Sequence, residues 1–293
     1  MRTTLLVASL LVGLSFPARI LNGQKPADNG ELDRLVARQF PRVAASVVCI
    51  RTLIQREFSG VDPNTGRMTT FKAPVALHGT GIVIDSIREN GRTEYIILTN
   101  HHVADPSNYF EIDGRFLRER KDNHRNAPLL REASYLVDTS EDDYEADDIL
   151  LVEIGRNAAG DAALLKTVGA HRPLAVFAGV IGFEDGDLAA GTPVMTAGFP
   201  IGWHRVTGRG QLTTVDYYHE LGIPHHDFAV DLPLRPGQSG SPVFAVGLRP
   251  GDGEPEVVFT LIGLLHARDG GTPLVVPYPL WKELLDAVPD AAH

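Results

Sequence analysis

The sequence contains one cysteine, Cys49, in 293 residues. This excludes an intramolecular disulfide and any zinc site built from several thiolates. A basic surface stripe is also lacking, since 37 acidic residues face 27 Lys and Arg and the formal net charge is −10. A protein that binds nucleic-acid phosphates is therefore disfavoured. No segment approaches 18 uninterrupted apolar residues, so the chain beyond its first residues is predicted to be soluble.

The first 22 residues bear on localisation. Arg2 precedes an apolar run over 5–16, which has the length of a signal-peptide hydrophobic region. We therefore expect an exported protein, secreted or periplasmic. Ala18 is a candidate cleavage site, but the large Phe16 two residues earlier fits such a site poorly. Membrane tethering through residues 1–22 and a buried N-terminal helix or strand are the alternatives.

The remainder reads mostly as short strands between turns, in keeping with 29 Gly and 20 Pro. Apolar residues at helical spacing predict a helix over 31–40, closed by Pro41, and a second helix over 279–288. The polar stretch 115–147, rich in both charges, is predicted to be a surface loop or hairpin. An all-β barrel or sandwich follows from the pattern of strands. The ten predicted strands are 45–51, 81–85, 95–99, 148–154, 194–198, 211–216, 228–232, 242–246, 257–265 and 272–276.

A serine lies in a tight turn that glycines punctuate, Pro236-Gly-Gln-Ser-Gly-Ser-Pro242. Glycines on both sides of Ser239 permit backbone conformations that a Cβ would forbid, and they let a substrate carbonyl approach closely. Such a turn can aim the amides of Gly237 and Ser239 at one point, which is what an oxyanion needs. A plain Gly-Ser turn is the structural alternative.

A serine hydroxyl needs a base to become a nucleophile, and the base needs an orienting carboxylate. His101 and His102 follow the apolar strand 95–98, and Asp147 and Asp148 precede the apolar strand 149–152. Either feature alone is a common structural one. Together with Ser239 they form the order His, Asp, Ser, and residues so distant in sequence can meet between two halves of a β fold.

These segments resemble the trypsin-like, chymotrypsin-fold serine proteases, specifically the bacterial branch that contains HtrA-type proteases and glutamyl endopeptidases. The resemblance covers most of the chain from about 45 to 285. It implies that His102 is the general base, Asp148 the orienting acid and Ser239 the nucleophile. The matching pieces are GTGIVID (79–85), LTNHHV (98–103), DDILLVEI (147–154), LAAGTPVMTAGFPIG (188–202), the serine segment 231–243, LIGLLHA (261–267) and VVPYPLWKELL (275–285).

The resemblance implies two antiparallel six-stranded barrels with the site between them. We place the protease domain at 30–289, with the first barrel near 45–157 and the second near 172–276. Because successive strand side chains point to opposite faces, only one of His101 and His102 is expected to face the cleft. The implied reaction is hydrolysis of a protein or peptide substrate through an acyl-enzyme on Ser239, with no metal or organic cofactor.

The chain also departs from trypsin itself. Gln238 stands where trypsin has the acidic residue that pairs with a newly cut N-terminus, so we expect no activation step of that kind. Pro233 replaces the acid that selects basic substrates. Leu234 and Leu265 suggest a neutral P1 residue, and His266 is a further candidate contact for a bound side chain. Only 54 residues follow Ser239, which predicts a stand-alone protease domain without a PDZ domain.

Other classes of function fit less well. An α/β-hydrolase elbow needs glycine at position 241, which is Ser, and its triad runs in another order. A dinucleotide fingerprint starting at Gly79 fails because position 84 is Ile. His225 and His226 beside Asp227 invite a metal site, but no metal-binding spacing supports one, and surface histidines are expected. The remaining alternative is a catalytically inactive barrel pair that binds extended peptides by strand addition.

Overall fold

The computed structural model describes residues 29–62, 64–104, 134–138, 149–184, 186–200, 204–217, 227–250, 255–269 and 271–288. The predicted export segment, Asp148 and most of the polar stretch 115–147 lie outside the described residues. None of the helices in the described ranges is long and apolar enough to cross a membrane.

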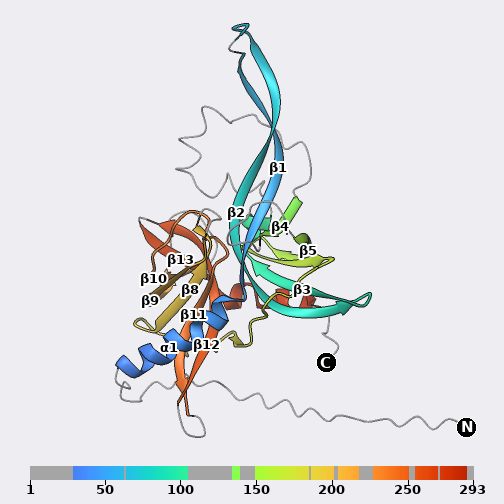
Figure 1. Cartoon of the computed structure of the whole chain (residues 1–293). Helices are drawn as coiled ribbons and strands as arrows, with labels where there is room; N and C mark the ends of the chain where they lie inside the picture. The colour runs from blue at the N-terminus through green and yellow to red at the C-terminus, as the bar shows by residue number, and fades with distance from the viewer. Residues whose placement is uncertain are drawn as a thin grey trace, which may run out of the picture.

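The first β-domain is a closed barrel of six antiparallel strands in the order β1-β2-β3-β6-β5-β4 (Figure 1). β4 lies inside the polar stretch, and β6 lies beyond residue 157, where the sequence placed the end of this barrel. Neither was among the ten predicted strands. The strands are β1 (Val47–Val61), β2 (Met68–Glu89), β3 (Arg92–Thr99), β4 (Ser134–Asp138), β5 (Ile149–Asn157) and β6 (Ala162–Val168).

The second β-domain confirms the other predicted barrel. Its sheet has the order β11-β8-β9-β10-β13-β12-β7, and a further pairing of β11 with β12 closes six of these strands into a ring. The short β7 is added in parallel at the edge of β12. The strands are β7 (Val180–Ile181), β8 (Pro193–Gly198), β9 (Val206–Tyr217), β10 (Asp227–Val230), β11 (Pro242–Arg249), β12 (Glu256–Asp269) and β13 (Thr272–Pro277).

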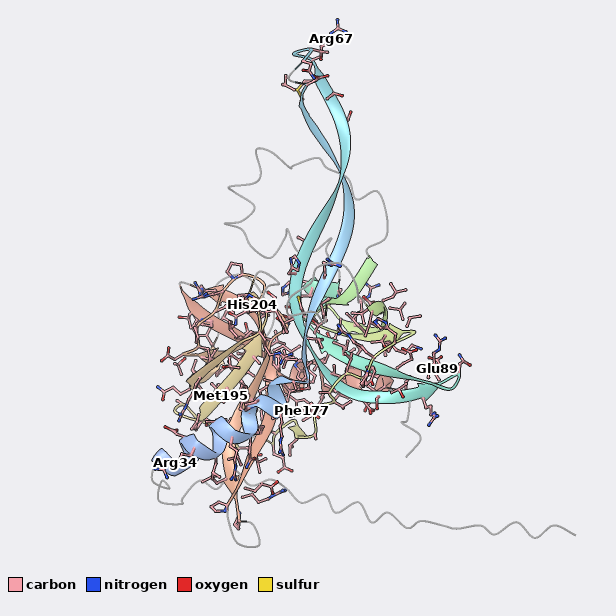
Figure 2. The ribbon with its side chains drawn as sticks, in the orientation of Figure 1. Arg34, Arg67, Glu89, Phe177, Met195 and His204 are labelled. Carbon is pink, nitrogen blue, oxygen red and sulfur yellow. The ribbon has the colours of Figure 1, made fainter. Side chains whose placement is uncertain are left out.

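A long two-stranded arm rises from the first barrel (Figure 1). β1 and β2 remain paired from Val47 opposite Ile82 to Val61 opposite Met68, so each strand is much longer than its predicted barrel segment. Arg67 lies at the far end of the arm (Figure 2). The turn there is closed by a 2.9 Å hydrogen bond from the Asp62 amide to the Arg67 carbonyl.

Strand alternation divides the apolar side chains into three clusters. Val48 and Ile50 of β1 point into the first barrel, whereas Val47 and Cys49 belong to a cluster between the two barrels. A third cluster fills the second barrel. Because the period of a strand is two residues, one strand serves both the barrel interior and the interface, and the two barrels are held together by a shared core.

The N-terminal helix α1 (Asn29–Ala44) covers part of that shared core. The expectation that Pro41 ends it is wrong, because the helix continues three residues further. Proline removes one intrahelical donor. Burial of Phe40 and Ala44 on either side of it offsets this loss, and Phe40 packs edge-on against Phe244 with ring centroids 6.0 Å apart.

The C-terminal segment also differs from the predicted single helix. It forms two 3₁₀-helices, η3 (Tyr278–Leu280) and η4 (Lys282–Ala287), separated by Trp281. The Trp281 indole is fully buried and donates a hydrogen bond of 3.3 Å to the Val276 carbonyl. Anchoring this ring between the two turns favours the tighter geometry over one continuous α-helix.

Candidate active site

The histidine pair lies in a helical turn rather than on a strand. Residues His101–Ala104 form the short helix α2 directly after β3, and both histidines are buried. The expectation that strand alternation separates His101 from His102 is therefore wrong. The turn is stabilised because the Asn100 carbonyl accepts the amides of Val103 and Ala104, at 3.2 and 3.3 Å.

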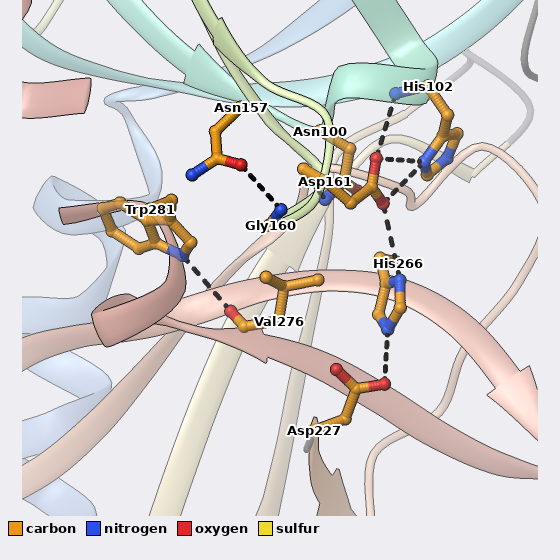
Figure 3. Close-up of polar contacts among 9 residues, drawn as sticks. All are labelled: Asn100, His102, Asn157, Gly160, Asp161, Asp227, His266, Val276 and Trp281. Carbon is orange, nitrogen blue, oxygen red and sulfur yellow. Dashed lines mark hydrogen bonds and ion pairs between the residues drawn. The ribbon is translucent and has the colours of Figure 1, made fainter. Parts of the chain in front are cut away.

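His102 contacts the carboxylate of Asp161 (Figure 3). Its Nδ1 lies 2.9 Å from Oδ2 and 3.1 Å from Oδ1, and its backbone amide donates to Oδ1 at 3.0 Å. An ionised carboxylate only accepts hydrogen bonds, so Nδ1 must carry the proton. The Asn100 side chain adds a bond of 2.9 Å to the Asp161 carbonyl. Asp161 thus fixes both the position and the tautomer of His102.

The turn before β6 places Asp161 at this point. Asn157 accepts the Gly160 amide at 2.8 Å and donates to the Leu280 carbonyl at 2.8 Å, so η3 supports the turn. Asp161 has a φ of +40°, in the left-handed region that non-glycine residues rarely adopt. Such strain is typical of functional positions that the surrounding structure holds in place.

Asp161 was not among the residues selected from the sequence. The predicted acid, Asp148, lies outside the described residues, so its role stays a prediction. A signal for Asp161 was present, because DAALLKTV (161–168) is an acid followed by an apolar run, as is DDILLVEI (147–154). The first segment lies beyond residue 157, the predicted end of the first barrel.

The environment of Asp161 keeps its carboxyl ionised. Burial alone would raise the pKa of Asp161, but the charge of His102 and hydrogen bonds from His102 and His266 lower it, and the net pKa is well below the usual range. The group is therefore a carboxylate at neutral pH. It is able to stabilise a positive charge on His102.

His266 on β12 lies on the far side of Asp161 (Figure 3). Its Nδ1 is 3.4 Å from Asp161 Oδ2, and its Nε2 is 2.9 Å from Asp227 Oδ2. The His266 side chain is only 2% exposed and that of Asp227 is 0% exposed. With both ring nitrogens facing carboxylates, this geometry does not favour a direct contact between His266 and a substrate side chain.

The serine turn rests on both barrels. The Ser239 carbonyl accepts the Thr80 amide at 2.8 Å, and the Gly240 amide donates to the Leu265 carbonyl at 2.8 Å. Gly240 has a φ of +83°, and a Cβ there would lie 2.0 Å from the Thr80 carbonyl oxygen. Only glycine allows this close approach between the turn and β2.

The amides of Gly237 and Ser239 have no acceptor among the described residues. Gly237 has a φ of +88°, and its carbonyl accepts the Thr80 hydroxyl at 3.2 Å. Ser239 itself is partly buried. The turn therefore combines a serine with two backbone amides that donate to no acceptor among the described residues.

Of the predicted substrate-binding residues, Leu265 is fully buried in the core of the second barrel, and Leu234 is partly buried beside the same cluster. The Leu234 carbonyl accepts a hydrogen bond from Arg268. No group of three or more His, Cys, Asp or Glu side chains that could hold a metal ion is found in the ranges that the structure describes.

Comparison with known proteins agrees with this architecture. Residues 79–248, more than half of the chain, match the model of the trypsin-like peptidase domain. A search of curated proteins found no significant match. The fold is similar to that of Deg5, with a TM-score of 0.52, 15% identity, and coverage of 89% of this chain and 95% of Deg5.

The HtrA-type protease AlgW, solved with a decapeptide, has the same fold, with a TM-score of 0.51 and 17% identity. The match covers 87% of this chain and 66% of AlgW. A variant of AlgW, also with a decapeptide, gives a TM-score of 0.51 at 15% identity, over 88% of this chain and 66% of the variant. On the family match and the fold together, the chain belongs to the trypsin-like peptidase domain family.

Proposed function

We propose that this protein is a serine endopeptidase with Ser239 as nucleophile, His102 as general base and acid, and Asp161 as orienting acid. The observation that carries the proposal is the contact of His102 Nδ1 with a buried carboxylate at 2.9 Å. In this assignment Asp161 takes the role that the sequence suggested for Asp148. Nε2 of His102 is the proton acceptor, because Asp161 engages Nδ1.

Hydrogen bonds tie the serine turn to the two strands that lead to His102 and His266. The Ser239 carbonyl accepts a hydrogen bond from the Thr80 amide, and the Thr80 carbonyl accepts one from the Thr99 hydroxyl at 2.7 Å. Thr99 is the last residue of β3, the strand that leads to His102. On the other side, the Gly240 amide donates a hydrogen bond to the carbonyl of Leu265. The next residue, His266, contacts Asp161. These contacts support an arrangement in which the serine turn and the His102–Asp161 pair meet between the barrels.

The chemistry is acyl transfer to the serine oxygen. His102 removes the Ser239 proton as the hydroxyl attacks the peptide carbonyl, and it returns a proton to the leaving amine. Asp161 stabilises the imidazolium that forms in between. The amides of Gly237 and Ser239 would hold the oxyanion, a contribution of about 3–4 kcal/mol per donor in other enzymes. In the second half of the reaction, His102 removes a proton from a water molecule as it attacks the acyl-enzyme, and it returns a proton to the Ser239 oxygen as the ester bond breaks.

The substrate class follows from the fold and from the peptide-bound relative. AlgW was solved with a decapeptide, and an extended peptide can bind by adding a strand to a sheet edge. Leu234 beside the serine turn favours a neutral P1 side chain. We expect a protein or peptide substrate, an exported enzyme and, through residues 1–22, the option of membrane tethering.

Covalent labelling by a fluorophosphonate tests the proposal, because only an activated serine reacts. We expect labelling of the full-length protein at Ser239, with loss of labelling in Ser239→Ala and a loss of at least about 10³-fold in His102→Ala. Cleavage of a peptide library would then report the P1 preference. A folded protein that binds peptides but never labels would contradict the proposal and favour the inactive peptide-binding module.

A further inference from the structure

Beyond the triad, the structure contains a buried ion pair that the proposed mechanism does not use. His266 and Asp227 lie on β12 and β10 in the second barrel, 39 residues apart in sequence, with Nε2 and Oδ2 separated by 2.9 Å. Both side chains are almost completely buried. Burying charged groups is costly unless they are paired, so this arrangement requires an explanation.

The backbone directs His266 toward the triad. The pairing of β12 with β13 shifts register between Leu265 and Ala267, so His266 is the extra residue of a β-bulge. A bulge breaks strand alternation and can re-aim a side chain, and bulges are frequent beside active sites. Leu264 belongs to the cluster between the barrels and Leu265 to the core of the second barrel, so both faces of β12 are buried where the bulge places His266.

The two contacts of His266 determine its protonation. A neutral imidazole has one donor and one acceptor nitrogen, whereas both nitrogens of His266 face carboxylate oxygens that only accept. Only the imidazolium satisfies both contacts. Burial by itself lowers the pKa of His266, but hydrogen bonds and the charges of Asp161 and Asp227 raise it to about 9.

We propose that the His266 imidazolium, held by Asp227, is a positioning group that keeps Asp161 ionised and oriented toward His102. Asp161 Oδ2 is shared between the two imidazoles, at 2.9 Å from His102 and 3.4 Å from His266. Asp227, His266, Asp161 and His102 thus form one buried chain of contacts in which carboxylates and imidazoles alternate. The proposal rests on the proposed function, since it assigns a role toward the same triad.

Loss of the His266 proton would break this chain at its weaker contact. The 3.4 Å contact to Asp161 is longer than the 2.9 Å contact to Asp227, so Nδ1 is the nitrogen that loses its proton. Its lone pair would then face the Asp161 carboxylate and repel it. Among the residues that the structure describes, the titratable groups near the pair include His102, beyond Asp161, and Tyr217, opposite Asp227 on β9. We therefore expect reactivity to fall at alkaline pH as His266 is neutralised.

Two measurements on the full-length protein test the inference. The ¹⁵N spectrum of histidine-labelled protein should show one buried histidine with both ring nitrogens protonated at pH 7, titrating near pH 9. Asp227→Asn keeps the shape and an acceptor oxygen but removes the charge, so it should lower the pKa of this histidine. The rate of fluorophosphonate labelling should be measured as a function of pH. In the wild type it should decrease at alkaline pH, in His266→Gln this decrease should be absent, and in Asp227→Asn it should occur at lower pH.

The exposed His171 provides a matched control, and His171→Gln should leave both the spectrum of the buried histidine and the labelling profile unchanged. A neutral buried histidine at pH 7, or an alkaline limb that Asp227→Asn does not move, would overturn the inference. Because the spectrum is read on wild-type protein, it decides the matter even if His266→Gln does not fold. If His266 is charged but the fluorophosphonate never labels the protein, the proposed function is refuted and the charged state of His266 is not.

Discussion

The backbone amide of Thr80 donates a 2.8 Å hydrogen bond to the carbonyl of Ser239, and this bond joins the two barrels at the proposed nucleophile. The Thr80 side chain reinforces the contact. Its hydroxyl donates to the Gly237 carbonyl at 3.2 Å and accepts the Phe199 amide at 3.0 Å. The first barrel therefore shapes the serine turn as well as supplying the histidine.

Removing the Thr80 hydroxyl should weaken both the fold and the turn. Thr80→Val keeps the shape of the side chain but leaves the buried Phe199 amide and the Gly237 carbonyl without this partner. We expect a loss of about 1–3 kcal/mol in the free energy of unfolding, measured in urea. The labelling rate of Ser239 should fall as well. Thr80→Ser, which retains the hydroxyl, is the control, and equal behaviour of the two variants would contradict the assignment.

Gly240 tests the close approach of the barrels directly. In Gly240→Ala the new Cβ would meet the Thr80 carbonyl oxygen at 2.0 Å and the Thr99 hydroxyl at 2.5 Å, with φ at +83°. We expect at least about 10²-fold slower labelling, since small displacements of catalytic groups have large effects. Gly247→Ala on β11 is the control, because a Cβ there has nothing within 4 Å. Unchanged labelling in Gly240→Ala would show that the turn adapts.

The sequence predicted strongly patterned parts of the fold and missed parts that depend on long-range contacts. All ten predicted strands overlap observed ones, and most of their apolar residues are buried. β4 lies in a polar stretch, where hydrophobic patterning carries little signal. His101 and His102 were assigned to a strand end, but Asn100 instead begins a helical turn.

The acidic residues of the site show the same limit. Asp148 and Asp161 both precede apolar runs, and only the spatial position of the second beside His102 distinguishes them. Asp227 drew attention only as the neighbour of His225 and His226, a possible metal site, and the pattern does not indicate that it is fully buried. Its partner His266 lies at a β-bulge, and a one-residue register shift leaves no mark in the hydrophobic pattern.

Substitution of the two acids separates the competing assignments. Asp161→Asn keeps the size of the side chain but removes the charge that holds the Nδ1 proton of His102. We expect a loss of about 10⁴-fold in labelling rate or in peptide hydrolysis, as in other triads with the wrong tautomer. Asp148→Asn should stay close to wild type. The opposite result, with activity lost only in Asp148→Asn, would restore the acid suggested by the sequence and leave Asp161 a structural role.

The raised pKa of His266 also makes stability depend on pH, with a definite sign. Because the pKa is about 9 in the folded protein and 6.5 for an ordinary histidine, the folded state binds the proton more tightly than the unfolded chain. The stabilisation, on the order of 3 kcal/mol, is fully present below pH 6.5 and is lost as pH rises toward 9. The melting temperature of the wild type should therefore fall across this interval more steeply than that of His266→Gln, in which this proton is absent.

Differential scanning calorimetry between pH 6 and 10 measures the two slopes, and His171→Gln should follow the wild type. Parallel curves for wild type and His266→Gln would mean that the imidazole is neutral in the folded protein, contrary to its position between two carboxylates.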